Sequence, residues 1–150
     1  MFIIKIFGLS LIVASSTFMG VLKSCSLVAR YKKILLLLDG ANALYNFIEQ
    51  GGYELEYIVK KSFSKCDFLS FRENRIYCDD NDLKDEKIFT NEFFAILGNS
   101  VKKIECDNIN GFILKLKMCL KEAEKEATQK SKVYRTLGLC IGLVIAILLI

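Results

Sequence analysis

The stretch VYRTLGLCIGLVIAILLI, residues 133–150, determines how the rest of the chain is interpreted. Its last part, Thr136–Ile150, carries no charged side chain, and a chain of 150 residues has no domain large enough to cover so much apolar surface. Lipid is therefore the predicted solvent. Tyr134 and Arg135 suit the interface, because their polar ends can reach the headgroups. The sequence predicts a transmembrane helix over residues 136–150.

A second apolar run lies near the other end of the chain. Residues 6–22 (IFGLSLIVASSTFMGVL) carry no charge and as a helix would span roughly 26 Å, which approaches the thickness of a bilayer core. We interpret residues 1–22 as an N-terminal transmembrane helix. A buried helix or a cleaved signal peptide is the alternative. Cleavage would release an extracytoplasmic protein that begins near Ser16 or Cys25.

Basic residues flank both apolar runs on the side that faces the middle of the chain. Cytoplasmic flanks of membrane helices are enriched in Lys and Arg. We therefore expect a two-pass protein of the cell membrane, with residues 23–135 as a cytoplasmic helical bundle and both termini facing away. The predicted interface anchors are Lys23, Arg30, Lys32, Lys33, Lys130, Lys132 and Arg135.

Small residues recur at helical spacing in both runs. Gly138 and Gly142 form a GxxxG pair, and Ser16 and Gly20 form a similar pair of small residues. Such residues let helix backbones approach closely in lipid. These four residues are the predicted contact between the two transmembrane helices.

The middle of the chain has a helical pattern. It contains no proline, which fits long unbroken helices, and apolar residues recur at spacings of three and four. The sequence predicts an all-α fold, an antiparallel helical bundle flanked by N- and C-terminal transmembrane helices. The first helix continues to Gly51-Gly52, and a second begins at Tyr53.

The later helices are less sharply defined. Residues 67–82 are ambiguous, and Asp80 or Asn81 is the predicted N-cap of a helix that runs to Leu97. The last helix is long. A break remains open at Asn108–Gly111, because this segment contains poor helix formers. Its predicted inward stripe comprises Val101, Ile104, Phe112, Leu116, Leu120, Ala123 and Ala127, and it leads into Tyr134, Leu137 and Ile141.

Sequence motifs for chemistry are missing. All 17 acidic residues lie within residues 34–127, so the folded middle is slightly acidic, which disfavours nucleic acid as a partner. The chain has no histidine, and its six cysteines show no CxxC spacing, so we expect reduced thiols and no metal site. A nucleotide-binding loop and a catalytic triad are also missing. We predict no enzyme activity, no catalytic residue and no cofactor.

The tail resembles the end of stage III sporulation protein AB of endospore-forming bacteria. That family closes with a Tyr/basic pair, then Leu-Gly and Gly-Leu in an apolar tail, as Tyr134 to Leu143 do here. Similar features elsewhere are Gly8, the run Ala14-Ser15-Ser16-Thr17 with Gly20, and Leu97-Gly98 before the final helix. The likeness is vague over residues 53–95. A proline expected after the first helix is replaced by Gly51-Gly52-Tyr53.

The resemblance implies a location in the mother-cell membrane around the forespore. It also implies a place in a transenvelope channel complex. The cytoplasmic bundle of the chain would then be similar to the cytoplasmic domain of type II secretion F proteins. The implied partners are membrane lipid, a cytoplasmic ATPase and other channel subunits, and homo-oligomer formation stays open. A generic membrane-anchored adaptor or regulator, unrelated to sporulation, is the alternative function.

Overall fold

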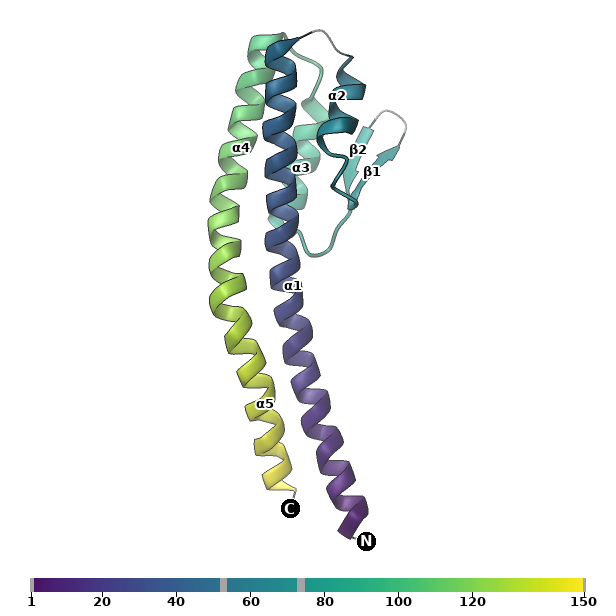
Figure 1. Cartoon of the computed structure of the whole chain (residues 1–150), viewed down its shortest axis with the longest axis vertical. Helices are drawn as coiled ribbons and strands as arrows, with labels where there is room; N and C mark the ends of the chain where they lie inside the picture. The colour runs from purple at the N-terminus through teal and green to yellow at the C-terminus, as the bar shows by residue number, and fades with distance from the viewer. Residues whose placement is uncertain (1, 52–53, 73–74, 150) are drawn as a thin grey trace. The chain divides into compact units, whose positions relative to one another are not determined.

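The computed structural model describes residues 2–51, 54–72 and 75–149 of the chain. They are mainly helical, with one small hairpin between the second and third helices (Figure 1). The predicted fold class, an all-α bundle with long apolar helices at both ends, is confirmed. The chain divides into two compact units: Met1–Ala29 with Ala123–Ile150, here the anchor unit, and Arg30–Glu122, here the central unit.

Helix α1 (Phe2–Gln50) is a single helix that contributes to both units. Its continuity through residues 22–50 confirms the prediction that the first apolar run extends into the bundle. It ends at Gly51, whose φ of 72° is a left-handed conformation that a glycine adopts without a steric penalty. Gly52 and Tyr53, where the second helix was expected to begin, lie outside the described residues.

The anchor unit pairs the start of α1 with helix α5 (Ser131–Leu148), which follows α4 (Lys102–Lys125) and a π-helical turn, η1 (Glu126–Lys130). Ser16 of α1 contacts Gly138, and Ser24 contacts Ser131. Because rising numbers on one helix meet falling numbers on the other, the two helices run antiparallel (Figure 1).

Both long apolar helices leave their most apolar windows largely unburied. The structure has two helical segments long and apolar enough to cross a membrane, Phe7–Gln50 and Lys102–Leu148. Only 11% and 22% of their most apolar windows is buried in the structure. Burial against protein therefore does not account for their composition, and a membrane location is compatible with both.

The central unit packs its helices around a mixed aliphatic and aromatic core. Ile34, Leu37 and Leu44 of α1 are fully buried. Helix α2 (Leu55–Ser62) is followed by buried Phe63, whose ring lies 5.2 Å from that of Phe94. Burial of each such side chain contributes about 1.5–3 kcal/mol to stability. The core also holds Leu83, Ile109, Phe112 and Leu116.

Gly40 allows Phe63 to pack directly against α1. A Cβ atom on Gly40 would lie 2.5 Å from Cδ1 of the Phe63 ring. Since real Cβ atoms do not approach other carbons so closely, any larger residue at position 40 would displace the ring. The glycine therefore costs α1 some helix propensity and in return places an aromatic ring in the core.

The ambiguous segment 67–82 forms a β-hairpin. Strand β1 (Leu69–Arg72) pairs antiparallel with β2 (Arg75–Cys78), in the register Leu69 opposite Cys78 and Phe71 opposite Ile76. Leu69 and Cys78 are buried, whereas Phe71 and Tyr77 are exposed. Burial is thus confined to the end of the hairpin where Leu69 lies opposite Cys78, and the exposed end carries no alternating pattern.

Two predictions about the later helices were wrong, and the break left open at Asn108–Gly111 does not occur. Helix α3 (Asp85–Ile96) begins after Lys84 with no side-chain cap, so neither Asp80 nor Asn81 is its N-cap. Helix α4 is unbroken through Asn108–Gly111. Val101 and Ile104 are 73% and 52% exposed rather than inward, because the buried face of this segment begins only at Glu105.

A glycine follows the end of α3, which lies close to its predicted end at Leu97. Gly98 has a φ of 89°, and its N–H donates to Glu105 Oε1 over 2.7 Å. The N–H of Ser100 donates to the same oxygen over 3.2 Å. A carboxylate in the first turn of α4 thus satisfies donors in the loop between α3 and α4, and its negative charge also suits the positive end of the helix dipole.

Candidate functional site

The four small residues predicted to join the apolar helices meet in the anchor unit. A Cβ atom on Gly20 would lie 2.5 Å from the carbonyl oxygen of Tyr134, and one on Gly138 would lie 2.9 Å from that of Ser16. A Cβ atom on Gly142 would lie 3.0 Å from Cα of Val13. The backbones therefore touch along this seam, which we call the glycine seam (Ser16, Gly20, Gly138, Gly142).

A hydrogen bond reinforces the glycine seam. The hydroxyl of Ser16 donates to the carbonyl oxygen of Gly138 over 2.7 Å. Such bonds between apolar helices contribute about 0.6–2 kcal/mol each in lipid, where water does not compete. The seam is thus held by close backbone packing and by a polar contact.

The glycine seam ends in a polar cluster that the sequence analysis missed. Ser24 and Ser131 are buried and hydrogen-bonded to each other through their hydroxyls. Arg135 donates from Nε to Ser24 Oγ over 2.8 Å. The available signal was the spacing, because Ser24 follows Gly20 by four residues just as Gly20 follows Ser16.

The predicted basic anchors divide into two groups. Lys23, Lys32, Lys132 and Arg135 are exposed, and Lys130 is exposed and bonded to Glu126 within its own helix. These charges are on the surface, as an interface anchor requires. Their role as interface anchors stays a prediction.

Arg30 and Lys33 take a different position from the other basic residues. Arg30 is buried in an ion pair with Glu86 of α3. Lys33 Nζ lies 2.6 Å from carboxylate oxygens of both Asp80 and Asp82. Burial by itself would lower the pKa of Lys33, but the hydrogen bonds and charges of the two aspartates outweigh it and raise that pKa. These two cations join α1 to the segment around α3, so they are internal contacts of the central unit.

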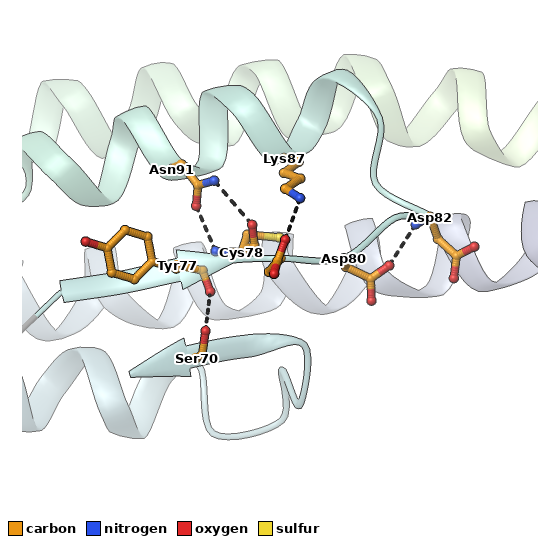
Figure 2. A network of polar contacts seen from close by, with 8 residues as sticks. Ser70, Tyr77, Cys78, Asp80, Asp82, Lys87 and Asn91 are labelled. Carbon is orange, nitrogen blue, oxygen red and sulfur yellow. Dashed lines mark hydrogen bonds and ion pairs between the residues drawn. The ribbon is translucent and has the colours of Figure 1, made fainter. Parts of the chain in front are cut away.

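A side chain of α3 completes the outer edge of the hairpin (Figure 2). Asn91 Oδ1 accepts the Cys78 N–H over 2.7 Å, and its Nδ2 donates to the Cys78 carbonyl over 3.2 Å. The amide thereby occupies the place of a third strand at Cys78. Beyond it, Asp80 accepts the N–H of Asp82, and Lys87 bonds Asp79 over 2.6 Å. Asp80 thus shapes a turn rather than starting a helix.

The cysteines are free thiols, two of them deeply buried. Burial raises the pKa of Cys66 to about 12, and it also raises that of Cys78. Because the thiolate is the reactive form, both are poor nucleophiles at neutral pH. Within the described ranges, no three or more His, Cys, Asp or Glu residues gather as metal ligands.

Fold and contacts together define a small helical protein whose two apolar helices are paired through glycines and are separated in sequence by a helical unit. A family model described as stage III sporulation protein AB matches residues 80–150. This match confirms the resemblance to that family seen in the sequence. The match covers α3, α4 and α5 with the turn between them.

The match implies a sporulation-related role. No curated protein and no solved structure matches the chain.

Proposed function

We propose that the chain is a non-enzymatic membrane platform in a sporulation-specific, secretion-like transenvelope channel complex, and that it engages a cytoplasmic ATPase. The observation that carries this proposal is the family match over residues 80–150. The glycine seam supports it, because backbone contact between two apolar helices suits a permanent anchor in lipid.

The central unit would be the part that engages the ATPase. Its Arg30 and Lys33 form internal ion pairs. Its hairpin and α3 contribute buried side chains to the same core as the other helices of the unit. A rigid unit of this kind can transmit force to its anchor without chemistry of its own. The other channel subunits would assemble around it in the mother-cell membrane that surrounds the forespore, with the central unit in the cytoplasm.

Deleting the gene tests the role in sporulation. We expect the deletion strain to complete engulfment and then fail to form heat-resistant spores, and a copy of the gene in trans should restore them. Spore yield equal to that of the parent strain would reject the proposal. A generic adaptor predicts such normal yield together with a defect in vegetative cells.

Engagement of an ATPase needs a separate measurement. The chain, tagged and solubilised from sporulating membranes, should copurify a cytoplasmic ATPase. The matched control is a chain of the same anchor unit in which residues 30–122 are replaced by an unrelated helical domain. Equal recovery of the ATPase with both chains would mean that the central unit does not recruit it.

A further inference from the structure

The π-helical turn η1 interrupts the helix between the last residues of α4 and the glycine seam. Here the Ser131 N–H donates to the carbonyl of Glu126, five residues earlier, instead of four as in an α-helix. Ala123, which precedes the turn, is 1% exposed, and Ser131, which follows it, is 5% exposed. All of these residues belong to the anchor unit.

Without the π-turn, the buried positions of this helix would not share one face. At ~100° per residue, Ser131 would lie about 80° around the helix from Ala123, Gly138 about 60° and Gly142 about 100°. Yet Ser131, Gly138 and Gly142 are all buried, as is Ala123. A regular helix would therefore turn the whole seam about a quarter turn away from the face that buries Ala123.

The single extra residue of a π-turn corrects this mismatch. It shifts the helical phase of all later residues by one position. This rotates them by ~100° back toward the face of Ala123. Ser131, Gly138 and Gly142 then fall within about 40° of Ala123. The buried positions on both sides of η1 thereby share one face.

Local side chains favour the π-turn at this place. The Thr128 hydroxyl lies 2.8 Å from the carbonyl oxygen of Glu124 and 3.2 Å from that of Lys125. These carbonyls lie where the π-turn interrupts the regular i to i−4 hydrogen bonds of the backbone. The Thr128 hydroxyl therefore supplies a hydrogen-bond donor to them. Lys130 and Glu126 form an ion pair across the turn.

We propose that η1 is a phase-correcting turn, which sets the rotational register of the C-terminal apolar helix so that the glycine seam faces α1. The inference goes beyond the proposed function and does not depend on it. It predicts that one residue can be removed inside η1 but not beyond it, because only inside η1 is a residue surplus to the α-helical register.

Two matched single-residue deletions test the proposal in the full chain in detergent micelles. Deleting Gln129, which is exposed within η1, should convert the turn to α-helix and leave the seam in place. Deleting Thr136, which is also exposed but lies between Ser131 and Gly138, should rotate Gly138 and Gly142 away from α1. The readouts are the temperature at which the chain aggregates and the contact between α1 and α5.

The contact is measured by oxidising the pair Ser24→Cys and Ser131→Cys in a background of Cys25→Ala and Cys140→Ala, which removes the exposed native thiols of this unit. The Gln129 deletion should keep the midpoint temperature and the disulfide yield of the undeleted chain. The Thr136 deletion should lower the midpoint. A Gln129 deletion as damaging as the Thr136 deletion, or a Thr136 deletion without effect, would overturn the proposal.

Discussion

Arg30 and Glu86 lie opposite each other with side chains only 10% and 1% exposed. In water such a pair contributes little, but here removal of one partner leaves a buried charge with no counterion. The sequence marks Arg30 as one of four closely spaced cations and cannot distinguish it from Lys32, which is exposed. What separates them is the position of α3, more than fifty residues later in the chain.

We expect Glu86→Gln to lower the unfolding free energy of the central unit by about 3–5 kcal/mol, because Arg30 then stays buried without a full counterion. The matched control is Glu56→Gln, which breaks the exposed pair of Glu56 with Lys60 and should cost under about 0.5 kcal/mol. The measurement is the urea dependence of Cys66 labelling in the full chain. Equal effects of both substitutions would contradict the burial of the Arg30 pair.

The Cys66 thiol should react slowly in the folded chain. With a pKa of about 12 its thiolate fraction at pH 8 is on the order of one in ten thousand, and the group is also buried. We expect alkylation of Cys66 to be at least ~100-fold slower than that of Ser64→Cys, an exposed position two residues away. In denaturant the two rates should become equal. Similar rates in the folded chain would show that Cys66 is accessible.

The same thiol gives a pH dependence of a definite sign. Its folded-state pKa lies above the unfolded value, so the folded chain holds the proton more tightly. The stability that it contributes is fully present below about pH 8.5 and is lost as the pH rises toward about 12. Cys66→Ala should therefore flatten the decline of the unfolding free energy in this range, whereas the slope below about pH 8 should stay unchanged.

At the scale of elements, the helices follow from apolar spacing and from glycine. Gly51 and Gly98 both end helices with positive φ, as their place after a periodic run predicts. The hairpin could not be predicted in this way. Its strands are four residues each, and the bonds that complete its edge come from Asn91, thirteen residues after Cys78. The polar end of the seam depends similarly on Ser131 meeting Ser24, a contact far apart in sequence.

The glycine seam gives a test at this scale. Gly138→Ala places a methyl group against the backbone of Ser16 and Gly20, so the helices must separate. We expect a loss of about 1–3 kcal/mol, seen as a lower midpoint temperature of the full chain in detergent. Gly8→Ala is the control on α1, because nothing described lies within 4 Å of its added Cβ. A tolerated Gly138→Ala would show that the backbones do not touch there.

At the scale of the whole molecule, the predicted topology remains to be tested, and the structure identifies suitable probes. Cys66 and Cys78 are buried and would report accessibility of the core rather than the side of the membrane. Ser64→Cys is exposed and serves instead. The chain is expressed in non-sporulating cells, so that it lies in the cell membrane; there a membrane-impermeant thiol reagent should leave Ser64→Cys unmodified until lysis, whereas a cysteine appended after Ile150 should react directly. The reverse pattern would place the central unit outside the cytoplasm.

Gly111 lies inside α4, exposed, with open space where a side chain would be. No contact among the described residues requires the small size of Gly111. The glycine therefore lowers the helix propensity of α4 without enabling any close packing. Gly111→Ala should thus raise the unfolding free energy of the central unit by about 0.5–1 kcal/mol, measured as a higher urea midpoint for Cys66 labelling. A variant stabilised at this one position would tolerate purification better. It would also let the more destabilising substitutions above be studied in a protein that still folds.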